Sequence, residues 1–253
     1  MDQHFKIIVP FYNVENWIRN TIRSTRAQDY KNFQCILIND ISTDSTLAIA
    51  EEEVGDDPRF SIIDNKQKKY VLQNFIDGIE FSNPGKEDVI VTLDGDDWFA
   101  RKDALSILEK TYREKDCWLT YGSYVEYPSS IRGKFSTQVP DSIIENNTFR
   151  ESPWMTSHLR SWKYGLWEKI DKERSFVEPD AIDENNHFAN CWDLAYMFPL
   201  VELAAKRMEY VEELLYVYNR KNPLNVDKLD HTSQLRMEQK IRGMEKYEPL
   251  KKL

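Results

Sequence analysis

Apolar and polar positions follow two different periods along the first 115 residues. Short apolar runs, often β-branched, are typical of buried strands, and they occur at 5–10, 33–38, 60–63 and 89–93. Segments with apolar residues on one helical face predict helices at 14–27, 46–54, 71–81 and 104–115. A strand followed by a helix, repeated along the chain, predicts a mainly parallel sheet covered by helices, which is an α/β fold.

This regular alternation ends near residue 118. The later residues predict a strand at 119–127, a helical segment at 157–170, an apolar helix at 192–205, edge strands at 208–211 and 214–218, and a charged helix at 233–247. Loops are expected at 128–140 and 173–190. We therefore expect two halves of one domain, 1–127 and 128–220, followed by a helical extension at 221–253.

Composition narrows the class of protein. A chain of 253 residues with 41% apolar residues is long enough to bury a full core, and its net charge of −9 argues against a nucleic-acid surface. Three scattered cysteines are too few for a disulfide framework, which favours a reducing compartment. The N-terminal residues lack a signal-peptide pattern, and no run approaches 18 apolar residues, so we expect a soluble, cytoplasmic protein.

Three carboxylates follow the strand at 89–93 within four residues: Asp94, Asp96 and Asp97. Carboxylates this close repel one another, so a divalent cation, a helix N-terminus or a cationic partner must offset the repulsion. Gly95 lies between the first two and permits close approach of the backbone to a ligand. The alternative is that Asp97 or Asp103 caps the next helix and the other carboxylates are solvated.

Polar residues also follow the other predicted parallel strands. In open α/β sheets ligands bind outside the carboxyl ends of the strands, so we expect residues 10–13, 39–40, 65–69 and 94–97 to meet at one crevice. No glycine-rich phosphate loop is present. A metal on the carboxylates, helped by Lys66, Lys68 or Lys69, is the simplest way to hold a phosphate there; the alternative for the lysines is a solvated turn.

One further carboxylate stands out, Asp193, in the first turn of the apolar helix at 192–205. It can stabilise the helix dipole there, or it can be held at a cleft as a general base. The residue pattern leaves both roles open.

Four segments together resemble a known family, the family 2 glycosyltransferases with a GT-A fold. These segments are Ile7-Ile8-Val9-Pro10-Phe11-Tyr12-Asn13, Ile38-Asn39-Asp40-Ile41-Ser42-Thr43-Asp44-Ser45-Thr46, Leu93-Asp94-Gly95-Asp96-Asp97-Trp98 and Trp192-Asp193-Leu194. They occur in the family's order and cover about residues 5–220, and Asp94-Gly95-Asp96 stands at the family's DXD motif. The resemblance implies a Rossmann-type sandwich with a mainly parallel central sheet flanked by helices and a C-terminal acceptor-side elaboration.

The resemblance also implies roles for individual residues. Residues 1–127 would be the nucleotide-sugar-binding half, in which Pro10, Tyr12 and Asn13 line the nucleotide pocket, Asp40 bonds the base, Asp94 contacts the ribose or sugar, Asp96 ligates Mn²⁺ or Mg²⁺, and Asp97 borders the sugar. Residues 128–220 would be the acceptor-binding half, in which Asp193 is the catalytic base and Trp154, His158 and Arg160 shape the acceptor site. Core packing is an equal alternative for Trp154.

Two positions depart from the family pattern. The helix before the acidic motif lacks the usual arginine, and Lys69 or Tyr70 is expected to replace it at the nucleotide. Asn219-Arg220 stands where many relatives carry arginine and histidine, so the third metal ligand is unassigned. His158 and His231 are candidates for it, or are ordinary polar contacts.

The function expected from these features is sugar transfer. The resemblance implies an inverting, metal-assisted transferase (hexosyl or related, EC 2.4 class) that uses a nucleotide sugar, typically a UDP-sugar, and a glycan or other hydroxyl acceptor. A nucleotidyltransferase is an alternative, but it would place a glycine-rich basic loop after the first strand, where residues 9–13 have none. A non-catalytic nucleotide- or carbohydrate-binding module is a third alternative, and the presence of both Asp96 and Asp193 argues against it.

Overall fold

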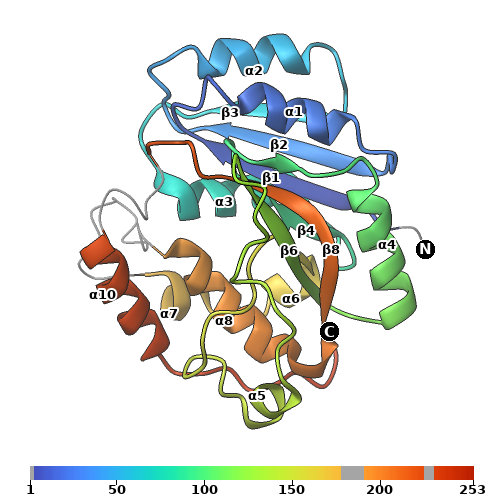
Figure 1. Cartoon of the computed structure of the whole chain (residues 1–253), viewed down its shortest axis with the longest axis vertical. Helices are drawn as coiled ribbons and strands as arrows, with labels where there is room; N and C mark the ends of the chain where they lie inside the picture. The colour runs from blue at the N-terminus through green and yellow to red at the C-terminus, as the bar shows by residue number, and fades with distance from the viewer. Residues whose placement is uncertain (1–2, 178–190, 225–230) are drawn as a thin grey trace.

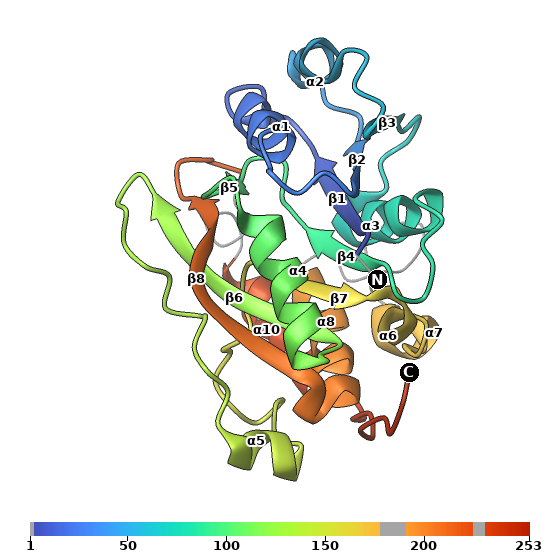
Figure 2. The same ribbon diagram turned by 90° about the vertical axis from the view of Figure 1, so that its right-hand side faces the viewer.

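The computed structural model describes residues 3–177, 191–224 and 231–253, and it is built around one eight-stranded sheet with helices on both faces (Figures 1 and 2). The strand order is β3-β2-β1-β4-β7-β6-β8-β5. The strands are β1 (Phe5–Phe11), β2 (Phe33–Asn39), β3 (Phe60–Asp64), β4 (Val89–Thr92), β5 (Trp98–Phe99), β6 (Leu119–Tyr127), β7 (Ser161–Lys163) and β8 (Met208–Asn219). The helices are α1 (Ile18–Arg26), α2 (Thr46–Val54), α3 (Tyr70–Phe81), α4 (Ala104–Lys115), α5 (Asp141–Asn146), α6 (Tyr164–Trp167), α7 (Lys172–Phe176), α8 (Trp192–Ala204), the 3₁₀ turn η1 (Ala205–Arg207) and α10 (His231–Arg242).

The first half of the chain forms the parallel part of the sheet, as the sequence predicts. β1 pairs in parallel with both β2 and β4, and β2 pairs with β3. Successive residues of β1 point to opposite faces of the sheet. Ile7 and Val9 pack on the face covered by α1 and α4, whereas Ile8 packs with Phe75 of α3 on the other face. Burial on both faces explains why these strands are continuous apolar runs rather than alternating ones.

Helix α3 lies unusually close to the sheet at Gly78. A Cβ atom at this position would be 2.8 Å from Ile38 Cδ1 and 2.8 Å from Ile8 Cγ2, which is closer than two carbon atoms can pack. Glycine therefore sets the distance between α3 and β1–β2, and this distance places the first turn of α3 at the end of β2.

The replacement Gly78→Ala is expected to lower the free energy of unfolding by about 1–3 kcal/mol, because the new methyl group overpacks the contact with Ile8 and Ile38. Urea unfolding measures the effect. Adding Ile38→Val should recover part of the loss, since it removes the Cδ1 atom in the contact. The control is Gly243→Ala, whose Cβ would meet its nearest atoms at 3.5 Å. Equal stability of the two glycine variants would contradict the close-packing argument.

The second half departs from the sequence prediction in two places. Residues 157–170, predicted as helical, contain β7, which fills the gap between β4 and β6 with antiparallel pairing before the short α6. The two predicted edge strands are one strand, β8, which lies between β6 and β5. In both places partners distant in the sequence supply the backbone hydrogen bonds, and local periodicity carries no information about them.

The C-terminal residues are fastened to α8 by buried polar contacts. Glu202 on α8 is fully buried and accepts from Arg150 Nε at 2.5 Å and from the backbone N–H of Tyr247 at 3.0 Å. Arg150 Nη1 also donates to the carbonyl of Ile241, at the end of α10. Because α8 carries Asp193, these contacts connect the C-terminal segment to the same helix as the predicted base.

Several boundaries in this half differ from the predicted ones. The helix expected at 233–247 is α10, which begins and ends earlier, and the loop expected at 173–190 includes most of α7, while residues 178–190 lie outside the described structure. In the described ranges, no helix combines the length and the apolar character that crossing a membrane requires.

Candidate functional site

The carboxyl ends of the parallel strands open into one cleft of about 510 Å³. All four predicted strand ends contribute to it, together with the start of α8 and the residues after β8. Of the residues predicted from the sequence, its lining includes Pro10, Tyr12, Asp40, Asp94, Asp96, His158, Arg160 and Asp193. It also includes residues to which the sequence assigned no site role, among them Asn74, Trp192, Tyr218, Asn222 and Leu224.

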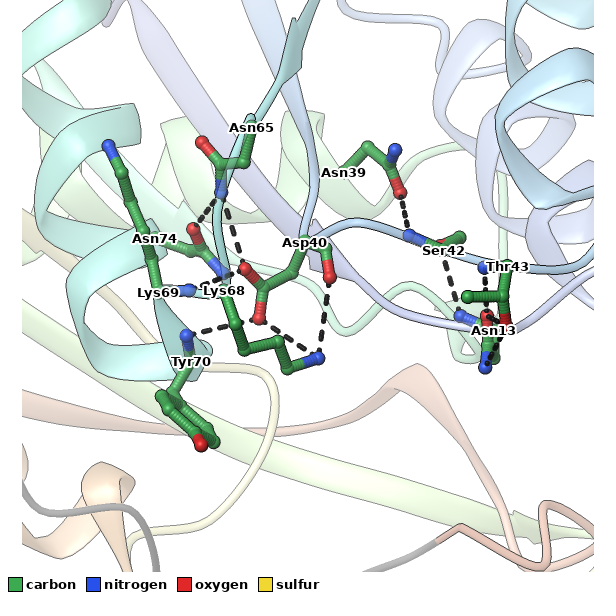
Figure 3. Close-up of polar contacts among 10 residues, drawn as sticks. All are labelled: Asn13, Asn39, Asp40, Ser42, Thr43, Asn65, Lys68, Lys69, Tyr70 and Asn74. Atoms are coloured by element: carbon green, nitrogen blue, oxygen red, sulfur yellow. Dashed lines mark hydrogen bonds and ion pairs between the residues drawn. The ribbon is translucent and has the colours of Figure 1, made fainter. Parts of the chain in front are cut away.

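Asp40 lines the cleft and is 4% exposed. Figure 3 shows its polar contacts. Its Oδ1 accepts from the backbone N–H of Lys69 at 2.8 Å, and its Oδ2 accepts from that of Tyr70 at 3.0 Å. The Nδ2 group of Asn65 adds a longer bond of 3.4 Å. Tyr70 has φ +60°, in the left-handed region. Asp40 thus ties the end of β2 to the start of α3 and holds the cleft wall in place.

The two lysines that follow this wall point in different directions (Figure 3). Lys69, predicted to contact the nucleotide, directs its Nζ to Asp77 Oδ2 at 2.6 Å and is not part of the cleft lining. Lys68 reaches the cleft instead: its Nζ lies 3.2 Å from Asp40 Oδ2 and 3.1 Å from the centroid of the Tyr12 ring. The structure therefore places Lys68, and not Lys69, beside the predicted nucleotide pocket.

Asn13 joins two of the sequence motifs and lies behind the cleft lining. Its Oδ1 accepts from the backbone N–H of Thr43 at 2.8 Å, and its own N–H donates to Ser42 Oγ at 3.1 Å (Figure 3). These bonds hold the loop after β1 against the loop after β2. Asn13 supports Pro10 and Tyr12, which do line the cleft, by fixing the loop in which they lie.

The carboxylate cluster divides into two half-buried members and one buried member. Asp94 and Asp96 line the cleft, whereas Asp97 is 1% exposed. Asp97 accepts from the hydroxyl of Tyr216 at 2.5 Å and from the backbone N–H of Asn219 at 2.7 Å. Asp97 was expected to border the sugar, but the structure places it behind the cleft, where it ties the acidic loop to β8.

The carboxyl groups of this loop lie close together, and two of them have raised pKa values. Burial, with Asp96 as the next cause, raises the pKa of Asp94 to about 7, and the same two causes raise the pKa of Asp97 well above its usual value. The positive charge of Arg160 acts in the opposite direction on Asp94. Gly95 keeps the loop against β1, since a Cβ there would lie 2.4 Å from Phe11 Cβ. The fold thus holds these carboxyl groups so close together that their charged forms are disfavoured.

Asp94 and Asp96 suit a divalent cation whose remaining ligands are water and phosphate oxygens. Asp94 and Asp96 offer carboxylate oxygens, and one of these, Asp96 Oδ2, accepts from Asn222 Nδ2 at 2.7 Å. Within the described ranges, no three His, Cys, Asp or Glu side chains are grouped to hold a metal by themselves. Mg²⁺ commonly binds one or two protein carboxylates and completes its shell with water and substrate phosphate oxygens, so the donor set suits such an ion together with a diphosphate.

Of the two histidines considered as a third metal ligand, only His158 has a described side chain. His158 Nε2 lies 3.8 Å from Asp94 Oδ2, and its ring is stacked on Tyr216 and Tyr218 with centroid distances of 4.6 and 5.6 Å. Burial, followed by the charge of Arg160, lowers the pKa of His158 well below its usual value, so the ring is neutral. The side chain of His231 lies outside the described part of the structure.

Asp193 lines the same cleft as Asp94 and Asp96. Its Oδ2 accepts from Arg160 Nη2 at 2.8 Å, and its Oδ1 accepts from the backbone N–H of Leu194 at 3.0 Å. The guanidinium of Arg160 is itself buried, and its Nη1 also donates to the hydroxyl oxygen of Tyr196 at 3.3 Å. The position is compatible with either role left open by the sequence, because Asp193 lies in the first turn of α8 and also lines the cleft.

Trp154 supports this wall from behind. Its ring packs edge-on against Phe198 with a centroid distance of 5.5 Å, and the Arg160 guanidinium lies 5.9 Å from its ring centroid. Trp154 is not part of the cleft lining, whereas His158 and Arg160 are. Of the three predicted acceptor residues, the structure therefore brings two to the cleft.

Sequence reasoning missed the contribution of the residues after β8. Asn222 reaches Asp96 across 126 residues of sequence, and Tyr218 stacks with His158. An isolated asparagine after a strand has no distinguishing pattern. The only available signal was the position of Tyr218 and Asn219 in the late strand, near which many relatives carry a histidine.

Comparisons with known proteins agree with this arrangement. The family model described as Glycosyl transferase family 2 matches residues 6–178. The glycosyltransferase GlyA of Streptococcus pneumoniae serotype 4 is 27% identical over 236 residues, which cover 89% of this chain and 32% of GlyA. The chain therefore spans about a third of that relative.

Two solved structures share the fold. S. aureus TarS 1–349 in complex with UDP-GlcNAc matches with a TM-score of 0.61 and 16% identity, over 87% of this chain and 59% of that one. Glucosyl-3-phosphoglycerate synthase from Mycobacterium tuberculosis, in complex with Mn²⁺, UDP and phosphoglyceric acid, matches with a TM-score of 0.61 and 13% identity, over 96% of this chain and 80% of that one. These likenesses confirm the GT-A-like fold expected from the sequence.

Proposed function

Because the chain belongs to glycosyl transferase family 2, we propose that it is an inverting glycosyltransferase that moves a sugar from a UDP-sugar to an acceptor hydroxyl. The observation that carries the proposal is that Asp94, Asp96 and Asp193 all line a single cleft. The sequence separates these carboxylates by about a hundred residues. In such a cleft Asp94 and Asp96 would bind the diphosphate with its metal ion, and Asp193 would act as the general base.

Residues 1–127 would form the donor side. Tyr12 would stack on the base and Asp40 would accept its imide hydrogen, while Pro10 borders the nucleotide and Asp94 the ribose or sugar. Asp96 would hold Mn²⁺ or Mg²⁺, and this ion, when bound, neutralises charge on the departing diphosphate. The Mn²⁺ and UDP named for the solved synthase support this assignment by analogy.

Residues 128–220 would form the acceptor side, and residues 221–253 would be a helical extension that follows it. As the acceptor oxygen bonds to the anomeric carbon, the bond from this carbon to the diphosphate breaks and Asp193 takes the hydroxyl proton. Attack from the face opposite the leaving group inverts the configuration. Arg160 would position the base by holding Asp193 Oδ2 at 2.8 Å, and His158 would present a neutral ring to the acceptor.

The proposal predicts that UDP together with Mn²⁺ raises the thermal midpoint. At a ligand concentration of about 100 Kd the native state gains roughly 2.7 kcal/mol, which is a shift of roughly 5–10 °C for a chain of this size. Differential scanning fluorimetry with UDP, GDP and ADP, each with Mn²⁺ and with EDTA, measures the shift. No stabilisation by any nucleoside diphosphate, with or without metal, would contradict the donor site.

Donor turnover then separates a transferase from a binding module. A transferase should release UDP from at least one nucleotide sugar in a panel, slowly with water and faster with a hydroxyl acceptor. Binding of UDP without any turnover across the panel would favour a non-catalytic module.

A further inference from the structure

The ammonium group of Lys68 lies in the part of the cleft where the nucleobase would bind. Its Nζ is 3.1 Å from the centroid of the Tyr12 ring, 3.2 Å from Asp40 Oδ2 and 3.3 Å from the carbonyl oxygen of Asp40. Figure 3 shows the side chain extending from the turn before α3 to these two oxygens. Lys68 thus covers an aromatic face and a carboxylate oxygen at the same time.

A nucleobase needs the same two surfaces. A planar base gains affinity by stacking on an aromatic side chain, and an imide N–H such as that of uracil requires an acceptor. The Tyr12 ring and the Asp40 carboxylate are the groups that supply them under the proposed function. A base and the Lys68 ammonium cannot occupy the face of Tyr12 together, since Nζ is already at contact distance from the ring.

We propose that Lys68 is a displaceable occupant of the nucleobase site, which the base must move aside in order to bind. This inference rests on the proposed function and adds a residue that controls donor affinity. A base with an imide hydrogen replaces both contacts of the ammonium, the cation–π contact by stacking and the ion pair by a hydrogen bond. A base without that hydrogen replaces only the first.

The surrounding contacts make this displacement feasible. Asp40 keeps the backbone N–H groups of Lys69 and Tyr70 when the ammonium leaves, so its carboxylate remains paired. The Lys68 side chain is a flexible stem with 30% of its surface exposed, and Tyr12 is 41% exposed, so the ammonium has a path to solvent. The framework of the site can therefore stay in place while only Lys68 moves.

Binding in competition with an internal group lowers the apparent affinity by the fraction of molecules in which the site is open. Removing the group should therefore tighten the binding of a ligand that contacts only this part of the cleft. Uridine is such a probe, because it has the base and lacks the phosphates, and its neutrality excludes a direct charge effect.

The test is the affinity of Lys68→Ala for uridine, measured by ligand-observed NMR titration. We expect the dissociation constant to fall by about 2- to 30-fold, the range that corresponds to a cation–π contact. Cytidine, whose N3 carries no hydrogen for Asp40, should bind more weakly than uridine to both proteins and gain by the same factor, because the open fraction of the site is a property of the protein. Lys68→Arg retains a cation over Tyr12 and should keep the wild-type affinity. Lys110→Ala on the exposed face of α4 removes the same charge outside the cleft and is the matched control.

Unchanged or weaker uridine binding by Lys68→Ala, with UDP binding to the wild type intact, would overturn the proposal and show that Lys68 is a direct ligand or a bystander. Equal affinities for uridine and cytidine would overturn the part played by Asp40. Failure of both the wild type and Lys68→Ala to bind UDP would instead refute the proposed function on which the inference rests. A UDP complex in which Lys68 still covers the Tyr12 ring would also overturn it, whatever the variants do.

Discussion

Asp193→Asn is expected to lower turnover by about 10²- to 10⁴-fold, the usual contribution of a general base, while UDP affinity stays at the wild-type value. The amide keeps the size of the side chain and an oxygen for Arg160, which now lies 2.8 Å from the carboxylate, but it cannot take the acceptor proton. Release of UDP from the fastest donor sugar measures turnover, and calorimetric titration measures UDP affinity. A fall in kcat with unchanged UDP binding is the signature of a lost base.

The control for this variant is Asp103→Asn, which neutralises a carboxylate at the start of α4 that pairs with Arg101 and lies outside the cleft. It should leave both turnover and UDP affinity unchanged. If Asp193→Asn turns over donor as fast as Asp103→Asn does, Asp193 is not the base.

Asp96→Asn is expected to weaken metal-dependent UDP binding by about 10²-fold, the loss that corresponds to a few kcal/mol of metal–phosphate interaction. The amide retains an oxygen to accept from Asn222 Nδ2, now 2.7 Å from Asp96 Oδ2, so the loop should keep its position. UDP affinity is measured with Mn²⁺ and with EDTA for the wild type and the variant. The two proteins should differ in Mn²⁺ and agree in EDTA.

Uridine provides the internal control for this second prediction. It carries no phosphate for a metal to bridge, so the wild type and Asp96→Asn should bind it equally. If Mn²⁺ raises the UDP affinity of Asp96→Asn as much as it raises that of the wild type, Asp96 is not a metal ligand. Weaker uridine binding would show instead that the loop had moved.

The two predictions concern residues that are held by different structural elements. Asp96 follows β4, a strand fixed by parallel pairing with β1, and Asp193 begins α8, which packs beneath the sheet and is fastened by Glu202 to Arg150. Each carboxylate has its own support. The variants therefore separate donor binding from proton transfer rather than testing one shared structural element.

The sequence by itself determined the parallel half of the sheet and the place of the cleft. The expected bounds 46–54 and 104–115 coincide with α2 and α4, because β-branched runs and amphipathic helices are set by local chemistry. The position of the cleft followed from topology alone, since parallel strands place their carboxyl ends at one edge. Residues directly after those strands, such as Asp40, Asp94 and Asp96, were therefore identifiable without a structure.

The tertiary structure decided what depends on partners distant in the sequence. It made a strand of residues 161–163, because β4 and β6 offered unpaired backbone groups on either side. It turned Lys68 inwards and Lys69 outwards, a choice set by the start of α3 and by Asp77. It buried Asp97 under Tyr216 and brought Asn222 to Asp96 across 126 residues. Local periodicity specifies which element a residue joins, whereas the direction and the neighbours of its side chain arise only when separate elements pack together.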